Sequence, residues 1–210
     1  MDPIDDRFLF SHPEVLSSSR NSQVILLKSR LPRGQPFDSI VKCFPSRARV
    51  EYEKEISVYT VLTENDVSFK YAKPIGYGQW SSQKYVKILG KKHSSLLDEG
   101  SDDIISVLML EFLEEAVPLS DSTNIIAQEP DSGLFIATSA LSSLAKLHSL
   151  GIVHGDISTS NVLLCESDSL WIDFSSSWIN APSNQIAWEW DRAVEYFSLW
   201  VNHRSNPAKK

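Results

Sequence analysis

The chain has 210 residues, of which 42% are hydrophobic and 22% are charged. These fractions are ordinary for a folded globular protein and exclude intrinsic disorder over most of the chain. The formal net charge of −7 argues against direct nucleic-acid binding, and no run reaches the roughly 18 apolar residues of a membrane-spanning helix. The acidic start MDPIDDRFLF lacks the basic region of a signal peptide.

The two cysteines, Cys43 and Cys165, are far apart and form no CxxC pair. Such sparse cysteines are typical of a reducing compartment, so we expect two free thiols that serve as small core residues. The expected location is the cytoplasm, with the nucleus as a second location.

The first 115 residues read mostly as strands with one helix. Residues 1–23 are polar and serine-rich, and Ser17–Ser19 and Asn21–Ser22 indicate a loop. Apolar runs indicate strands, a 3.6-residue period indicates a helix, and proline and glycine indicate turns. On these signals we expect a strand over 24–27, a turn over 31–36, a strand over 39–44, a helix over 46–63, a turn over 73–78, a strand over 85–89, a flexible connection over 91–103 and a strand over 104–113.

The second half is mainly helical. A helix is predicted to start at Pro130 to Ser132, to run to Leu150 and to stop at Gly151. Its expected buried face consists of Leu134, Ala137, Leu141, Leu144 and Ala145. A strand hairpin over 162–165 and 170–174 and a helix over 187–202 follow, with a frayed tail over 203–210. The order of elements predicts an α+β fold with two lobes.

Four charged residues stand where apolar residues are expected: Lys42 within a strand, Glu55 near the buried face of a helix, Asp156 after an apolar pair, and Asp173 at the end of an apolar run. A lone buried charge costs several kcal/mol, so each of them needs a partner or an ion. Taken singly, these residues are better explained as two structural salt bridges and two turn-capping aspartates than as catalytic groups.

Their spacing favours a chemical role. His154 to Asn161 has the form HxDxxxxN, with Asn161 five residues after Asp156, and Asp173 follows twelve residues later. Phosphoryl transfer needs a divalent metal ion on the ATP phosphates, and Mg²⁺ prefers carboxylate and amide oxygens. Asn161 enters the predicted hairpin and Asp173 leaves it, so one side of the hairpin can supply both oxygens. Asp156 is then the carboxylate that faces an acceptor hydroxyl and takes its proton.

At this point the sequence resembles the protein-kinase-like superfamily. The resemblance implies that Lys42 holds the ATP phosphates and that Glu55 pairs with this lysine. Met109 to Leu113 is similar to the hinge, with Leu110 as gatekeeper and the backbones of Glu111 and Leu113 meeting adenine. Asp156 is then catalytic, while Asn161 and Asp173 bind Mg²⁺. His154 is expected to hold its loop through hydrogen bonds to backbone carbonyls near Asp173.

The resemblance covers about residues 17–202, with an extension over 1–16, an N-lobe over 17–115 and a C-lobe over 116–202. The sequence HGDISTSN and the closing segment from Trp190 to Tyr196 resemble the small atypical Ser/Thr kinase of the KEOPS complex. Only 37 residues follow Asp173, APE is absent, and Ser158 stands where ordinary protein kinases carry lysine. A protein partner is therefore expected to complete the substrate site.

The nucleotide loop departs from the family pattern. A GxGxxG sequence is expected before Val24, yet residues 17–22 read SSSRNS and contain no glycine. Glycine lets backbone amides approach a phosphate without a Cβ clash, and in its absence Ser18 and Ser19 are expected to donate hydrogen bonds instead. Three functions stay open: an atypical Ser/Thr protein kinase, a small-molecule phosphotransferase, and a pseudokinase that serves as a binding module.

Two other motifs are set aside. Gly76 and Gly78 could begin a dinucleotide-binding sequence, but the third glycine and a following helix are absent from the pattern. His154, Asp156 and His203 match the residue types of a non-haem iron site, which needs a β-barrel that this pattern does not predict.

Overall fold

The computed structural model describes residues 2–4, 9–30, 35–65, 67, 69–90, 96–97, 103–121, 132–165 and 168–205. The chain forms two compact units. The first, here called the sheet unit, comprises Met1–Thr60 and Ala72–Phe112, and the second, the helical unit, comprises Val61–Tyr71 and Leu113–Lys210. The predicted α+β class with two lobes is confirmed. The helical unit thus includes Val61–Tyr71 as well as the part of the chain that follows Phe112.

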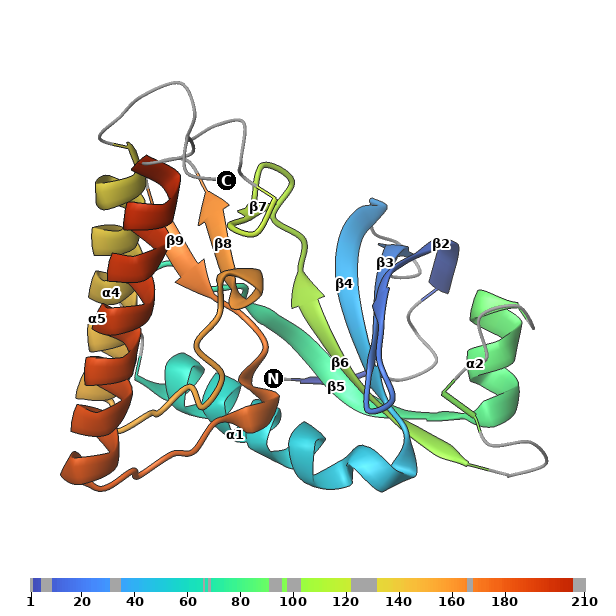
Figure 1. Ribbon diagram of the computed structural model, residues 1–210. Helices are drawn as coiled ribbons and strands as arrows, with labels where there is room; N and C mark the ends of the chain where they lie inside the picture. Colours follow the sequence, from blue (N-terminus) through green and yellow to red (C-terminus); the bar gives the residue numbers. More distant parts are fainter. Residues whose placement is uncertain are drawn as a thin grey trace. The chain divides into compact units, whose positions relative to one another are not determined.

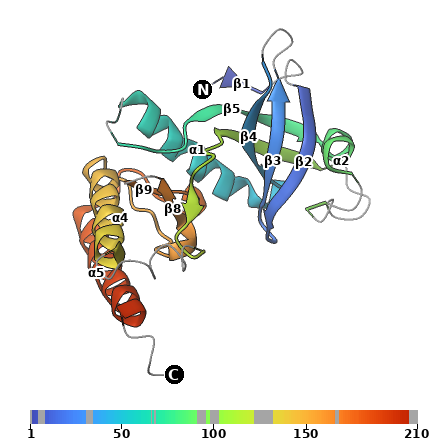
Figure 2. The same cartoon turned by 90° about the horizontal axis from the view of Figure 1, so that it is seen from above.

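The sheet unit contains a six-stranded sheet in the order β1-β5-β6-β4-β3-β2 (Figures 1 and 2). Strands β2 to β6 pair antiparallel, and β1 pairs parallel to β5. The elements of this unit are β1 (Asp2–Pro3), β2 (Leu9–Ser18), β3 (Gln23–Arg30), β4 (Phe37–Phe44), the 3₁₀ helix η1 (Ser46–Ala48), α1 (Arg49–Glu64), which continues into the helical unit, β5 (Pro74–Ser81), α2 (Ser82–Leu89) and β6 (Ile104–Glu111).

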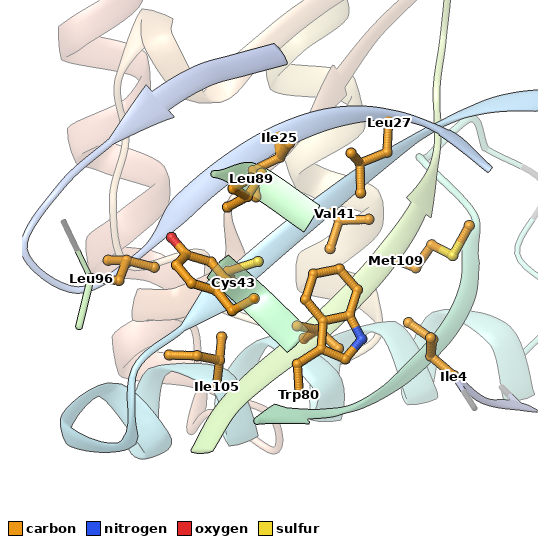
Figure 3. Packing of buried hydrophobic residues seen from close by; sticks show 12 residues of the cluster. Ile4, Ile25, Leu27, Val41, Cys43, Trp80, Leu89, Leu96, Ile105 and Met109 are labelled. Atoms are coloured by element: carbon orange, nitrogen blue, oxygen red, sulfur yellow. The ribbon is translucent and has the colours of Figure 1, made fainter. Parts of the chain in front are cut away.

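The two faces of this sheet carry different side chains, because successive residues of a strand point to opposite faces. In β4, Val41 and Cys43 point into an apolar core that also receives Tyr85 and Leu89 of α2 (Figure 3). Lys42 lies between them in sequence and therefore faces the other side, toward α1. The core consists of Ile4, Ile25, Leu27, Val41, Cys43, Trp80, Tyr85, Leu89, Leu96, Ile105, Val107 and Met109.

The helical unit is built on two long helices and a small sheet. Helices α4 and α5 lie side by side, and α4 also packs against β9 (Figures 1 and 2). The sheet has the order β7-β8-β9 with antiparallel pairing. The elements are β7 (Val117–Pro118), α4 (Ser132–Ser149), η3 (Thr159–Asn161), β8 (Val162–Cys165), β9 (Asp168–Trp171), η4 (Phe174–Ser176) and α5 (Ser183–Ser205).

Several predictions for the sheet unit are wrong or incomplete. The strand expected over 85–89 is helical, as α2, and the turn expected over 73–78 lies largely within β5. The loop expected around Ser17–Ser22 is shorter, because Ser17 and Ser18 end β2. Since β2 begins at Leu9, the sheet starts before residue 17, where the domain was expected to begin. The predicted turn over 31–36 and the connection over 91–103 lie largely outside the described residues.

In the helical unit, the predicted helices and hairpin are confirmed, with different ends. The predicted buried face of α4 is partly wrong, because Leu134 is 62% exposed and Ala145 is also exposed. Its buried face instead includes Ile136, Ala140 and Leu147. Helix α5 continues to Ser205, three residues into the expected tail, and residues 206–210 lie outside the described part.

Both cysteines are free and buried, as predicted. Burial in the core of the sheet unit raises the pKa of the Cys43 thiol far above its usual range, so this thiol stays protonated and unreactive. Across the described residues, the structure contains no helix that combines the length and the apolar character needed to cross a membrane.

Candidate functional site

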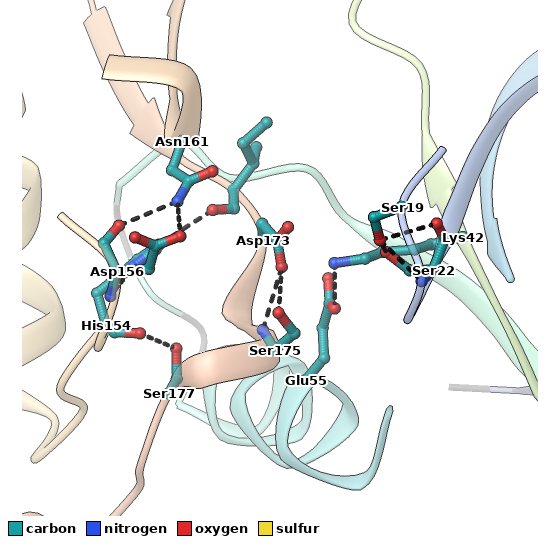
Figure 4. A network of polar contacts seen from close by, with 11 residues as sticks. Ser19, Ser22, Lys42, Glu55, His154, Asp156, Asn161, Asp173, Ser175 and Ser177 are labelled. Atoms are coloured by element: carbon teal, nitrogen blue, oxygen red, sulfur yellow. Dashed lines mark hydrogen bonds and ion pairs between the residues drawn. The ribbon is translucent and has the colours of Figure 1, made fainter. Parts of the chain in front are cut away.

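Lys42 and Glu55 form an ion pair inside the sheet unit (Figure 4). Lys42 comes from the α1-facing side of β4, Glu55 comes from α1, and the lysine Nζ lies 2.6 Å from Glu55 Oε2. The two side chains are only 5% and 1% exposed. The Lys42 ammonium also lies 5.1 Å from the centre of the Phe44 ring. The pair is therefore held in a partly aromatic, water-poor environment, where a fixed positive charge acts strongly on an anion.

The segment that resembles a hinge begins at the end of β6. Leu110 is buried and pairs with Ile40, so it lies on the same face of the sheet as Lys42. The Glu111 N–H donates to the Lys73 carbonyl at 2.9 Å, and the Leu113 carbonyl accepts from Ala116 at 3.0 Å. These two backbone groups already form hydrogen bonds within the protein. A ligand at Met109 to Leu113 would therefore contact other backbone N–H and carbonyl groups of this segment.

The glycine-free loop is a tight turn between β2 and β3. Ser18 is the last residue of β2 and pairs with Gln23. The Ser19 hydroxyl accepts a hydrogen bond from the backbone N–H of Asn21 at 3.2 Å. It also accepts one from the backbone N–H of Ser22 at 3.1 Å (Figure 4). Ser19 also donates its own N–H to the Ser22 carbonyl at 2.8 Å. The turn is thus closed by one serine side chain.

In the helical unit, Asp156 and Asn161 are in direct contact (Figure 4). The Asn161 amide nitrogen donates to the Asp156 backbone carbonyl at 3.0 Å and to its Oδ2 at 2.8 Å. Asp156 is exposed, whereas Asn161 is buried. The asparagine therefore fixes the direction of the carboxylate, and its own amide oxygen points away from Asp156.

Asp173 follows β9 and adopts a left-handed backbone conformation with φ of 63°. Its Oδ1 accepts from the Ser175 hydroxyl at 2.6 Å and from the Ser175 N–H at 3.3 Å. The Ile172 N–H donates to the Asn161 carbonyl at 2.9 Å, which extends the β8–β9 pairing. Asn161 and Asp173 thus lie at the same end of this hairpin, as their positions in the sequence predict.

The donor set of the hairpin suits Mg²⁺ only in part. The described residues contain no group of three or more His, Cys, Asp or Glu side chains that could hold a metal ion. One amide oxygen and one carboxylate are too few for a closed protein site, but Mg²⁺ characteristically takes one or two protein oxygens together with water and phosphate. Asn161 and Asp173 therefore fit a metal ion that arrives with a nucleotide.

His154 has a structural position behind this loop. Its ring is fully buried, and Nε2 lies 3.0 Å from the Ile172 carbonyl, next to Asp173, as the resemblance implied. Burial lowers the pKa of His154 below 6.5, although the Ile172 hydrogen bond and the carboxylates of Glu189, Asp173 and Asp156 oppose this shift. The imidazole is therefore neutral at physiological pH and donates one N–H to the carbonyl.

Glu189 of α5 is a site residue that the sequence analysis missed. This carboxylate is 2% exposed and accepts from the backbone N–H groups of His154 at 2.8 Å and Gly155 at 2.6 Å. It also lies 2.8 Å from Nε2 of the buried His148. Burial alone would raise the pKa of Glu189, but the hydrogen bonds from His148, Gly155 and His154 outweigh it and lower this pKa. Glu189 thus fixes the backbone immediately before Asp156.

Gly155 explains why the loop reads HGD. Its φ is +82°, a conformation that side chains rarely adopt. A Cβ at this position would also collide with the carbonyl of Ser176. The close approach of these two backbones therefore excludes an arginine between His154 and Asp156.

The comparisons with known proteins agree with this architecture. No protein-family model matches the chain. The chain is similar to the mitogen-activated protein kinase mpkC of Aspergillus niger, with 28% identity over 157 residues. The alignment covers 70% of this chain but only 39% of the length of that kinase. Together with the sheet unit and the helical unit, this similarity supports a protein-kinase-like fold.

Proposed function

We propose that the chain is an ATP-dependent phosphotransferase that transfers a phosphate to serine or threonine hydroxyls of a protein. The observation that carries this proposal is the buried ion pair of Lys42 and Glu55. Buried ion pairs contribute little to stability compared with apolar residues of similar volume, so a pair in this position indicates a use other than stability. A lysine held by a glutamate is the arrangement that binds ATP phosphates in protein kinases.

Each site residue has a role in this proposal. The Lys42 ammonium binds the α- and β-phosphates, and Glu55 holds the lysine in place. Asn161 and Asp173 hold Mg²⁺, which neutralises charge on the phosphates when it is bound. Asp156 orients the acceptor hydroxyl and takes its proton, which suits an exposed carboxylate whose direction is fixed by Asn161.

Within the protein-kinase-like superfamily, we propose that the chain is a small atypical kinase of the KEOPS type. This placement is supported by Gly155, because the loop geometry excludes the arginine that ordinary protein kinases use to sense a phosphorylated activation loop. Ser158 in place of lysine supports the same placement. We infer that a protein partner completes the substrate site and that the protein acts in the cytoplasm, with the nucleus as a second location. The two free buried thiols support a reducing compartment.

A pseudokinase that binds a nucleotide or a protein is the second candidate. The turn at Ser19 favours it, because two backbone amides of the proposed phosphate loop already have a hydrogen-bond acceptor in Ser19. The two candidates differ in chemistry rather than in fold.

Phosphate transfer from labelled ATP tests the proposal. Incorporation into the chain's own serines and release of ADP would be measured with Mg²⁺ for the wild type, Asp156→Asn and, as a matched control, Asp191→Asn on the exposed surface of α5. We expect Asp156→Asn to lower transfer by roughly 10²–10⁴-fold, the usual contribution of a general base, and Asp191→Asn to match the wild type. Equal transfer in all three proteins would exclude Asp156 as the base. ATP binding without any transfer in the wild type would favour the pseudokinase.

A further inference from the structure

The turn between β2 and β3 contains an anion-binding arrangement that is already occupied. The N–H groups of Asn21 and Ser22 are successive in the chain and converge on a single oxygen atom, at 3.2 Å and 3.1 Å. Successive backbone N–H groups that converge in this way form a concave site for an anion such as a phosphate oxygen. Here the oxygen belongs to the Ser19 hydroxyl of the same turn.

This turn lies close to Lys42 in the strand register of the sheet. In the register of β3 and β4, Gln23 pairs with Cys43 and Val24 with Lys42, so the turn begins one residue beyond these pairs. Figure 4 draws Ser19, Ser22 and Lys42 in one view, and all three residues belong to the sheet unit. If Lys42 binds the phosphates of ATP, this turn is a loop of the sheet unit that could also meet them.

Two further contacts hold the turn in its closed form. The Arg47 guanidinium donates to the Arg20 carbonyl at 2.8 Å, and the Asn21 side chain donates to Glu51 Oε1 at 3.4 Å. Arg47 and Glu51 belong to η1 and the first turn of α1. The tip is therefore fastened to the helix that carries Glu55, and the Glu51 carboxylate next to it repels an incoming phosphate.

We propose that Ser19 is a built-in competitor of the nucleotide phosphates: its hydroxyl occupies the two amides that a phosphate oxygen would otherwise take. This inference rests on the proposed function and deepens it. The sequence analysis expected Ser19 to donate a hydrogen bond to a phosphate, whereas here its hydroxyl accepts hydrogen bonds from the turn itself. A phosphate must displace an intramolecular acceptor, so ATP binds more weakly than the same turn would allow without the hydroxyl, whereas the adenosine moiety is unaffected.

The test is a comparison of ATP and adenosine affinities by calorimetry, with Mg²⁺, for wild type and Ser19→Ala. Removal of the hydroxyl makes the N–H groups of Asn21 and Ser22 available to a phosphate oxygen. We therefore expect ATP to bind roughly 3- to 10-fold more tightly, which corresponds to the net contribution of one or two hydrogen bonds. Adenosine affinity should stay within about 2-fold of wild type. Ser19→Thr keeps the hydroxyl and should match wild type, as should Ser17→Ala, an exposed serine of β2.

The outcomes separate this inference from the function on which it rests. ATP affinity in Ser19→Ala that equals or falls below that of wild type, with adenosine binding retained, would overturn the competitor role and leave the proposed function intact. Failure of wild type and all variants to bind either ligand at millimolar concentration would overturn both. Thermal unfolding of Ser19→Ala close to that of Ser19→Thr would show that the exposed turn tolerates the change.

Discussion

Lys42 and Glu55 lie 13 residues apart in the sequence and meet at 2.6 Å, nearly excluded from water, across the gap between β4 and α1. The pair joins the sheet to the helix within one unit. Two charges in such a place cost desolvation energy that their attraction only partly returns. The pair should therefore matter more for function than for stability.

A double-mutant cycle on this pair tests that expectation. Lys42→Met and Glu55→Leu each leave one buried charge without its principal partner, and we expect each single variant to lose about 3–5 kcal/mol of unfolding free energy. The double variant replaces the pair by apolar side chains and should recover most of this loss while it still fails to bind ATP. Denaturant unfolding and calorimetry would measure the two quantities. Additive losses in the double variant would contradict the reasoning, because coupled partners do not add.

Glu189 is expected to act as a positioning residue. Glu189→Gln keeps the shape but replaces one acceptor oxygen by an amide donor, which leaves a backbone N–H of His154 or Gly155 poorly satisfied. We expect a loss of about 1–3 kcal/mol of unfolding free energy and a fall in phosphate transfer, with ATP affinity within about 2-fold of wild type. Glu195→Gln, an exposed change on the same helix, is the control. A loss of ATP affinity that parallels the loss of transfer would indicate a general structural role instead.

Stability should fall in mild acid because of His154. Its pKa in the folded protein lies below the ordinary value of 6.5, owing to burial, so below pH 6.5 the unfolded chain binds a proton that the folded chain does not. The resulting loss approaches about 1.4 kcal/mol per pH unit until the folded pKa is reached. Denaturant unfolding should show the free energy of unfolding falling as the pH is lowered below 6.5, and His154→Gln should show a smaller fall.

The ring of His154 gives a direct check on the same reasoning. The NMR titration of this ring should have its midpoint below pH 6.5, because burial disfavours the charged imidazolium in the folded protein. A titration of this ring near its ordinary pKa would contradict the assignment.

The fold was predictable for elements whose sequence shows the apolar pattern of a buried face. The helices α4 and α5 and the strands β3, β4 and β6 contain apolar runs or periods that a buried face requires. Strand β2 was missed because it lies at the edge of the sheet, is mostly exposed and contains Pro13, so it has no apolar alternation. Helix α2 was misread because its four apolar residues all fall within the five positions Tyr85–Leu89, a stretch too short to distinguish a helix from a strand.

Part of the site was predictable because charged residues stand out within an apolar pattern. A charge inside an apolar pattern pointed to Lys42 and Glu55, and both are buried and paired. Glu189 carries the same signal, since it precedes the buried Ala193 and Phe197 at intervals of four on α5. It was missed because its partners, His154 and Gly155, lie 35 and 34 residues away and only the fold brings them together. The Ser19 turn depends on backbone geometry that residue types do not reveal.

The most direct test of the central claim is the Mg²⁺-dependent stabilisation of the protein by ATP. Thermal unfolding would be recorded with ATP alone and with ATP and Mg²⁺, for wild type, Asp173→Ala and the exposed control Asp168→Ala. The account predicts that Mg²⁺ increases the ATP-induced rise in melting temperature for wild type and Asp168→Ala, and that this increase disappears in Asp173→Ala while the rise with ATP alone remains. No rise in the wild type at millimolar nucleotide, with or without Mg²⁺, would contradict the claim that this chain is an ATP-dependent phosphotransferase.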